Sequence, residues 1–284
     1  MDNRPIGIFD SGVGGLTVAR SIIDLMPNEN VIYLGDSARG PFGPKPLDDV
    51  RDYTFEIISF LKDEGVKLVV IACNTAASAA LEQARAHFAG LPLMGVVEPG
   101  IHAGLAATRT GRIGLIGTVG TVEAGAYDAA LAATRKSAFL FKAACPDFVD
   151  YVERGETEGD EVEALARSYL KPLTDEDIDT LILGCTHYPL LAKTIKKVVG
   201  ESVTLVDSAD STAFEVADLL SSVGQRRIDS QPAWHRFISS GDPVAFASLG
   251  ERFLGPEVKG AEKISWPSMQ AGADAHEAGV VSRG

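Results

Sequence analysis

Two cysteines of this 284-residue chain stand in matching sequence contexts. Cys73 ends the aliphatic run LVVIAC and is followed by Asn-Thr, and Cys185 ends TLILGC and is followed by Thr-His. A thiol has an ordinary pKa of about 8.5, so it can act as a base or an acid near neutral pH. Two thiols that face one carbon from opposite sides could remove a proton on one face and return one on the other. That is the chemistry that interconverts mirror images.

Two other chemistries fit the same residues. Cys73, Cys185 and His187 offer three soft ligands for zinc, although neither a C-x-x-C nor an H-x(3–5)-H spacing is present. Alternatively, Cys185 could be a nucleophile activated by His187, which would share its face of an extended strand. This second arrangement accounts for Cys185 and leaves Cys73 without a role.

The residues around both cysteines predict where the thiols lie in the fold. A continuous Val/Ile/Leu run is typical of a parallel strand that is buried on both faces. Cys73 and Cys185 therefore fall at the carboxyl ends of strands, where open α/β sheets place their ligand sites. A helix is expected directly after each cysteine, and because helix N-termini lower thiol pKa values, we expect stabilised thiolates there.

Strand and helix patterns alternate along the chain, which predicts a doubly wound α/β fold with mainly parallel sheets. Strands are predicted within 6–10, 31–37, 67–73, 93–99, 112–121, 137–146, 180–189 and 203–210. Helices are predicted over 16–26, 47–64, 74–88, 100–108, 122–135, 147–156, 160–173 and 211–223, with a last strand and helix within 234–254.

The pattern also repeats along the chain. Ile6 and Ile113 stand in two similar strands that are each followed by glycines, 107 residues apart, and the cysteines of the two halves are 112 residues apart. Such self-similarity indicates a duplicated unit. We therefore expect a site that is built from two matched halves.

Composition excludes several classes of partner. Lys and Arg number 26 against 39 Asp and Glu, a net charge of −13, so we expect no nucleic-acid partner. No stretch reaches the roughly 18 apolar residues of a membrane span, and the start MDNRPIGIFDSG lacks the features of a signal peptide. We expect a cytoplasmic protein whose three cysteines are reduced thiols.

Six ordered blocks of the sequence resemble the motifs of the glutamate racemase family. The blocks are IGIFDSGVGGLTV, YLGDSARGPFG, VVIACNTAAS, ACPDFVDYVERG, TLILGCTHYPLL and VTLVDSA. The resemblance implies a cofactor-independent enzyme that makes D-glutamate for bacterial peptidoglycan. It also implies two pseudo-symmetric α/β domains with the active site at their interface. Residues 1–98 plus 208–266 would form the first domain, and 99–207 the second.

The resemblance implies a role for each matching residue. Cys73 would deprotonate the D-isomer and Cys185 the L-isomer. Polar partners of the thiols would be Asp10 and His187, with Glu153 assisting on the second side. The substrate glutamate would be held by Asp10, Ser11, Phe42, Gly43, Asn74, Thr75, Thr118, Thr121, Thr186 and His187. No metal and no cofactor are expected.

The chain departs from the family pattern in one loop. The family's P-Y-G-x-K-S is replaced by Pro41-Phe42-Gly43-Pro44-Lys45-Pro46, which removes a tyrosine hydroxyl and adds two prolines that should stiffen the loop. Cys145, in AACP, has no adjacent polar partner and is expected to pack in the core.

Two alternative functions stay open at this point. A racemase of the same superfamily could act on aspartate or another amino acid, because the depth of the pocket is not encoded in any motif. A small-anion-binding protein with structural thiols would keep the fold without the chemistry.

The sequence leaves the oligomeric state open, a homodimer included. Residues 267–284 have few large apolar side chains and are expected to form a mobile tail.

Overall fold

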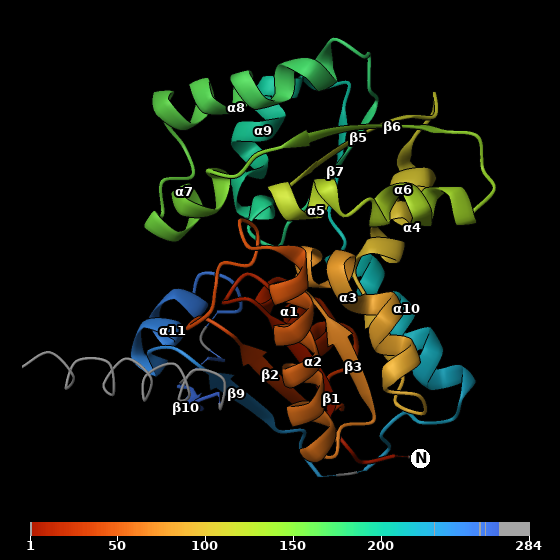
Figure 1. Cartoon of the computed structure of the whole chain (residues 1–284), viewed down its shortest axis with the longest axis vertical. Helices are drawn as coiled ribbons and strands as arrows, with labels where there is room; N and C mark the ends of the chain where they lie inside the picture. The colour runs from red at the N-terminus through yellow and green to blue at the C-terminus, as the bar shows by residue number, and fades with distance from the viewer. Residues whose placement is uncertain (1, 230, 256, 259, 267–284) are drawn as a thin grey trace, which may run out of the picture.

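The computed structural model describes residues 2–229, 231–255, 257–258 and 260–266, and these form two lobes stacked along the long axis of the molecule (Figure 1). The lobes are built on separate sheets, one with the strand order β10-β9-β2-β1-β3-β4 and the other with the order β6-β5-β7-β8. All strand pairs are parallel. The predicted tail, 267–284, lies outside the described residues.

Helices and strands alternate as the sequence predicts. The strands are β1 (Ile6–Asp10), β2 (Val31–Gly35), β3 (Leu68–Ile71), β4 (Leu93–Gly95), β5 (Arg112–Gly117), β6 (Phe139–Ala144), β7 (Thr180–Gly184), β8 (Thr204–Val206), β9 (His235–Ser239) and β10 (Glu262–Lys263). The α-helices are α1 (Leu16–Leu25), α2 (Leu47–Asp63), α3 (Asn74–His87), α4 (Val97–Ala107), α5 (Val119–Glu123), α6 (Ala126–Ala133), α7 (Phe148–Arg154), α8 (Asp160–Thr174), α9 (Ala192–Val199), α10 (Ala209–Ser222) and α11 (Pro243–Gly250). A 3₁₀ helix, η1, spans Tyr188–Leu191.

The two sheets share one topology, which confirms the predicted duplication. Strands β2-β1-β3-β4 of the first sheet match β6-β5-β7-β8 of the second in order and direction. Right-handed crossovers place α1 on one face of the first sheet and α2 and α3 on the other. Accordingly, α1 packs on α10, and α2 packs on α3. In both sheets the strand order reverses at the strand that starts the unit, so each lobe has a switch point where ligands bind.

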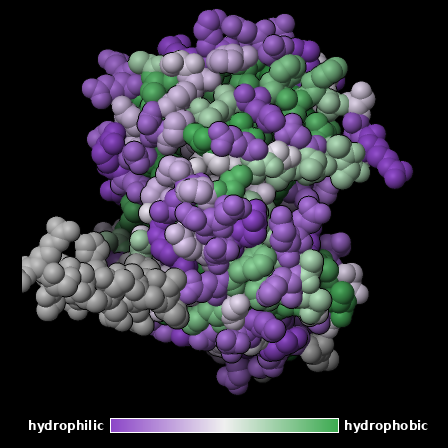
Figure 2. All heavy atoms as spheres, in the orientation of Figure 1, coloured by the Kyte–Doolittle hydropathy of each residue, from purple (hydrophilic) through white to green (hydrophobic). Residues whose placement is uncertain are grey.

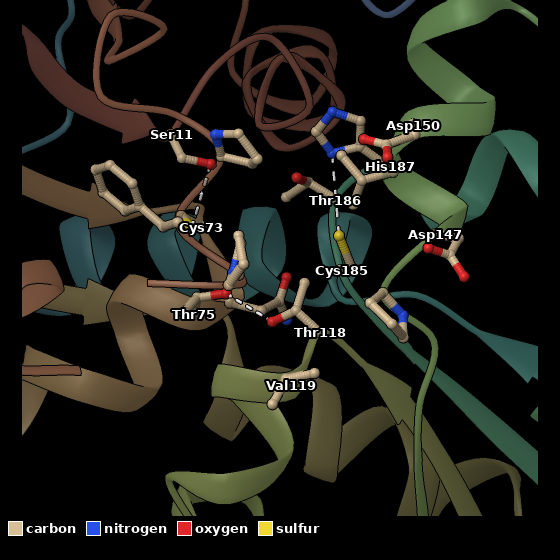
Figure 3. Close-up of a pocket in the computed structure, with 17 residues that line it drawn as sticks. Ser11, Cys73, Thr75, Thr118, Val119, Asp147, Asp150, Cys185, Thr186 and His187 are labelled. Carbon is tan, nitrogen blue, oxygen red and sulfur yellow. Dashed lines mark hydrogen bonds between the residues drawn. The ribbon is translucent and has the colours of Figure 1, made fainter. Parts of the chain in front are cut away.

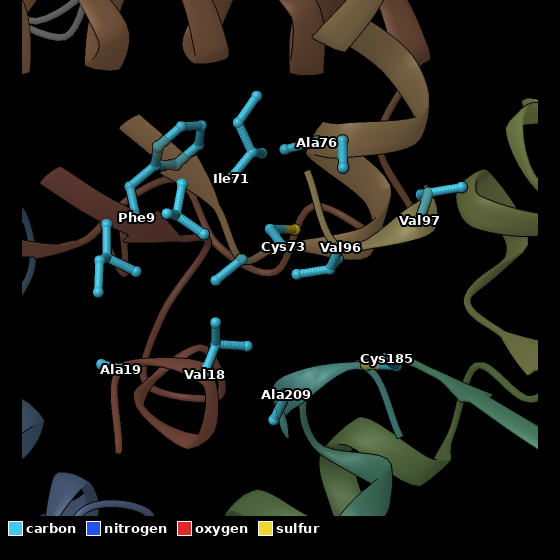
Figure 4. Close-up of a cluster of buried hydrophobic side chains, with 14 of the residues drawn as sticks. Phe9, Val18, Ala19, Ile71, Cys73, Ala76, Val96, Val97, Cys185 and Ala209 are labelled. Atoms are coloured by element: carbon cyan, nitrogen blue, oxygen red, sulfur yellow. The ribbon is translucent and has the colours of Figure 1, made fainter. Parts of the chain in front are cut away.

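The central strands are buried on both faces, which explains their continuous aliphatic sequences. All residues of β1, β2, β3 and β7 are buried. Their apolar side chains belong to one hydrophobic cluster that includes the thiols Cys73 and Cys185 (Figure 4). On the outer face shown in Figure 2, hydrophilic residues predominate and apolar ones lie in small areas between them.

Several predicted element boundaries are wrong, and two of them have a clear physical cause. The strand predicted over 93–99 ends at Gly95, and α4 begins at Val97 with Pro99 in its first turn. Proline is tolerated there because the first N–H groups of a helix have no partner within it. The helix predicted over 122–135 is divided into α5 and α6 at Gly125, whose φ of +69° interrupts the helix.

The chain passes between the lobes twice. It leaves the first sheet after β4 and enters the second at β5, and it returns between β8 and β9. The helices of these two connections, α4 and α10, pack against each other. The finer assignment of residues 1–98 with 208–266 to one domain and 99–207 to the other stays a prediction. No helix within the described ranges is long and apolar enough to span a membrane.

A buried ion pair ties the amino end of the first sheet to the returning chain. The fully buried Lys67 Nζ donates to Glu29 Oε2 at 2.6 Å and to the backbone oxygens of Asp2 and Gln225. Glu29 also accepts a hydrogen bond from the backbone N–H of Arg227 at 2.9 Å. Four segments that are remote in sequence, at residues 2, 29, 67 and 225–227, therefore meet at one charge pair.

Replacing Lys67 should destabilise the fold strongly. Lys67→Ala removes the buried cation that bonds to the Glu29 carboxylate and leaves the more distant Arg226 Nε, 3.8 Å from Oε1, as the cation beside it. We expect the free energy of unfolding to fall by about 3–5 kcal/mol. Urea unfolding followed by circular dichroism measures the change. The exposed Lys62, replaced by Ala, is the matched control and should change stability by less than about 0.5 kcal/mol. Equal effects of the two variants would contradict this account of the ion pair.

Candidate active site

Cys73 and Cys185 line one cavity of about 240 Å³ between the lobes. Cys73 lies two residues after the end of β3 and occupies the N-cap position of α3, and Cys185 directly follows β7. Because β3 and β7 are equivalent strands, the thiols come from equivalent ends of the two sheets. They lie on opposite sides of the cavity (Figure 3). Both are buried, with exposed fractions of 5% and 8%. The cavity is smaller than the roughly 300–1,000 Å³ of drug-sized pockets, which favours a small ligand.

Both lobes contribute residues to this cavity, as predicted. Ten of the predicted site residues line it: Ser11, Phe42, Gly43, Cys73, Asn74, Thr75, Thr118, Cys185, Thr186 and His187. Three predicted residues, Asp10, Thr121 and Glu153, are outside this lining and touch those that form it.

Cys73 occupies the N-cap position of α3, with its Sγ 3.8 Å from Ser11 Oγ. Burial raises the pKa of this thiol to about 12, and the nearby Asp10 carboxylate adds to the effect. The prediction that the helix N-terminus lowers its pKa is therefore wrong. The field of a helix terminus contributes about 0.3–1 kcal/mol, whereas burial shifts a pKa by as much as 3–5 units.

Cys185 has a different partner. Its Sγ lies 3.9 Å from His187 Nδ1, and the chain turns here into η1, so no α-helix begins at this thiol. Burial opposes the charged form of His187, but contacts with Cys185 and Glu153 outweigh it and raise the imidazole pKa to about 10. Glu153 Oε1 is 3.3 Å from Nε2, close enough for an ion pair but not aligned for a hydrogen bond. A protonated His187 therefore faces the Cys185 sulfur.

Asp10 lies behind the cavity at the end of β1 and is fully buried. Its carboxylate accepts hydrogen bonds from Gly12 N at 3.0 Å and from Thr186 Oγ1 at 3.4 Å. Burial raises its pKa, while the charge of His187 acts in the opposite direction. Asp10 thus joins the first lobe to the turn that carries Cys185.

A triangle of three hydroxyls joins the lobes beside the cavity. Thr75 Oγ1 lies 2.9 Å from Thr118 Oγ1 and 3.2 Å from Thr121 Oγ1, and the latter two are 3.0 Å apart. Thr118 also caps α5 by accepting from the N–H of Thr121. Because each hydroxyl can donate one bond and accept another, the triangle fixes three side chains across the lobe boundary.

The loop that departs from the family pattern forms one wall of the cavity. Phe42 is fully buried and packs on Tyr53, with 5.7 Å between the ring centroids. Gly43 accepts a hydrogen bond from Gly120 N at 3.1 Å. A Cβ at Gly43 would lie 2.7 Å from the side chain of Thr118, so only glycine allows this approach between the lobes.

Sequence reasoning missed one wall of the cavity, which is formed at α7 and α5. The missed residues are Val119, Pro146, Asp147, Val149 and Asp150. Positions 146, 147, 149 and 150 follow helical spacing one turn before Glu153, a signal that could have placed them on one face. Asp147 is held by a hydrogen bond from the Tyr169 hydroxyl.

A zinc site and a single nucleophile at Cys185 fit this geometry less well than two thiols acting together. Within the described ranges, no group of three or more His, Cys, Asp and Glu side chains is arranged to hold a metal ion. A single nucleophile at Cys185 would leave the second thiol of the same cavity unexplained. Cys145 is fully buried, with its Sγ 3.9 Å from the Ala143 carbonyl oxygen, and does not line the cavity, which agrees with a packing role.

Comparisons with known proteins agree with this arrangement. The family model described as Asp/Glu/Hydantoin racemase matches residues 10–216. A glutamate racemase from Beutenbergia cavernae is 52% identical over 270 residues, covering 91% of this chain and 92% of the relative.

Two solved structures extend the likeness to three dimensions. A glutamate racemase isoform from Bacillus anthracis superposes with a TM-score of 0.86 at 40% identity, covering 94% of this chain and 98% of that one. The glutamate racemase from Francisella tularensis, solved in complex with D-glutamate, gives a TM-score of 0.87 at 34% identity, covering 94% and 100%. The matched blocks, the two-lobed fold and these likenesses together show that the chain belongs to the Asp/Glu/Hydantoin racemase family, among its glutamate racemases.

Proposed function

We propose that this chain is an isomerase that interconverts L- and D-glutamate by two-thiol proton transfer at the α-carbon, without a cofactor. The observation that carries the proposal is the pair of thiols from equivalent strand ends on opposite sides of one small cavity (Figure 3). A stereocentre held between them would present its α-hydrogen to one sulfur and its opposite face to the other.

The proposed reaction moves one proton in and one proton out. With L-glutamate bound, the Cys185 thiolate takes the α-proton, and the C–H electron pair passes to the α-carbon and its carboxylate. The Cys73 thiol then gives its proton to the opposite face, which yields D-glutamate, a Cys73 thiolate and a Cys185 thiol. The conversion of D-glutamate to L-glutamate starts from the enzyme with a Cys73 thiolate and a Cys185 thiol. Proton exchange with solvent connects the two forms of the free enzyme.

The pKa values of Cys73 and His187 suit the state in which the reaction of L-glutamate starts. Because its pKa is about 12, Cys73 is a protonated thiol at neutral pH and is ready to donate. His187, with a pKa of about 10, is then a cation beside Cys185 and can hold the thiolate in place. Glu153 supports the positive charge of His187 from outside the cavity.

Substrate recognition would come from both lobes. The N-terminus of α3, at Asn74 and Thr75, offers N–H groups to a carboxylate, and the hydroxyls of Ser11, Thr118 and Thr186 surround the same space. Such contacts stabilise the charge that develops on the carboxylate when the α-proton leaves.

The comparisons support glutamate over the alternatives, because the relatives that cover most of the chain carry the name glutamate racemase. An aspartate racemase and a non-catalytic anion-binding protein are not favoured. We propose further that the D-glutamate serves bacterial peptidoglycan synthesis and thus cell shape. We also place the enzyme in the cytoplasm, whose reducing conditions suit its three free cysteines.

Each active-site thiol should be required for turnover. Cys73→Ser and Cys185→Ser should each lower kcat by at least about 10²–10⁴-fold, the usual contribution of a general acid or base. Polarimetry follows racemisation, and ¹H NMR in deuterated buffer follows loss of the α-proton of either isomer. Cys145→Ser is the matched control and should retain activity. The absence of α-proton exchange in the wild-type protein, with no cofactor added, would show that the proposed function is wrong.

The protonation of Cys73 can be tested by its reactivity. Only the thiolate is nucleophilic, so below a pKa of about 12 the rate of alkylation by iodoacetamide should rise about tenfold per pH unit from pH 7 to 9.5. Mass spectrometry of the Cys73 peptide measures the rate, with free N-acetylcysteine as the reference that levels off near its own pKa. A rate at Cys73 that levels off below pH 9 would contradict the raised pKa.

A further inference from the structure

Tyr127 on α6 is a buried residue of the second lobe whose hydroxyl bonds to the first lobe. Its side chain is 1% exposed, and its Oη accepts a hydrogen bond from Asn74 Nδ2 at 2.8 Å. Asn74 follows Cys73 directly and lines the cavity, whereas Tyr127 is not part of the lining. No motif of the sequence singles out this tyrosine.

The tip of Tyr127 also lies against the backbone on the second side of the site. A Cβ built on Gly184, the residue before Cys185, would be 3.5 Å from Tyr127 Oη. A Cβ on Gly100 of α4 would be 3.6 Å away. The hydroxyl is therefore enclosed between the residue that follows one thiol and the residue that precedes the other.

Packing alone does not account for the hydroxyl. Phenylalanine would fill nearly the same volume, and burial of a hydroxyl is unfavourable unless it is hydrogen-bonded. The Tyr127 hydroxyl is bonded to the side chain of Asn74, which forms part of the cavity wall. The other polar atom of that amide, Asn74 Oδ1, has no hydrogen-bond partner. The bond to Tyr127 is thus the side-chain contact that holds the Asn74 amide in the structure described.

We propose that Tyr127 is a positioning residue for the racemase, acting through Asn74. The hydroxyl holds the amide of Asn74 in one orientation at the cavity wall, so that it is ordered before the amino-acid substrate binds. This inference rests on the proposed function, because Asn74 is taken there as a substrate contact. Loss of the Tyr127 hydroxyl should act mainly on substrate binding, since neither thiol is removed.

The test is a double-mutant cycle with Tyr127→Phe, Asn74→Ala and the double variant. Tyr127→Phe should raise KM for both isomers about 3- to 10-fold, as expected for one buried hydrogen bond, and should change kcat less than threefold. If Tyr127 acts through Asn74, adding Tyr127→Phe to the Asn74→Ala variant should raise KM no further. Thermal unfolding of each variant checks that the fold is kept.

Tyr188→Phe provides the matched control. Tyr188 is also a fully buried tyrosine of the second lobe, and its hydroxyl donates to the Cys145 carbonyl oxygen at 2.7 Å, away from Asn74. Its effect on KM should combine multiplicatively with that of Asn74→Ala. Multiplicative effects for Tyr127→Phe as well, or an unchanged KM in an active enzyme, would overturn this inference and leave the proposed function standing. A wild-type protein without α-proton exchange would overturn both.

Discussion

The removal of two thiols from water at the junction of two lobes is the constraint on which this structure depends. A buried thiol resists ionisation, so each sulfur needs surroundings that set its protonation state. Cys73 lies beside the Asp10 carboxylate and stays protonated, whereas Cys185 has a cationic imidazole beside it. Two equivalent cysteines thus have unequal neighbours within a nearly symmetric frame.

The repeated topology explains why the thiols meet. Each four-stranded unit places a cysteine after the strand next to its switch point, and the units join with these ends facing. Neither lobe contains a complete site, so the distance between the sulfurs depends on contacts across the boundary. The threonine triangle, the Gly43–Gly120 hydrogen bond and the Asp10–Thr186 contact all lie there. Polar contacts of this kind fix the lobes in a defined register because each donor is matched to one acceptor.

Much of this site could be predicted from the sequence because its residues follow strands with a clear hydrophobic signature. Cys73 and Cys185 were predicted for this reason. Asp147 and Asp150 were missed because helical spacing groups them with Glu153 on one face but does not tell which part of the fold that face meets. The pKa of Cys73 was predicted in the wrong direction, since the effect of a helix N-terminus on the thiol is weaker than the effect of burial. Tyr127 was missed because its partner is 53 positions away.

The two passages of the chain between the lobes have a mechanical consequence. A single connection would join the lobes at one point, whereas here two connections, whose helices α4 and α10 pack together, join them at two. Two junctions restrain twisting and sliding of one lobe against the other more than a single junction would. This restraint adds to the contacts that keep Cys73 and Cys185 on opposite sides of the cavity lined by both lobes.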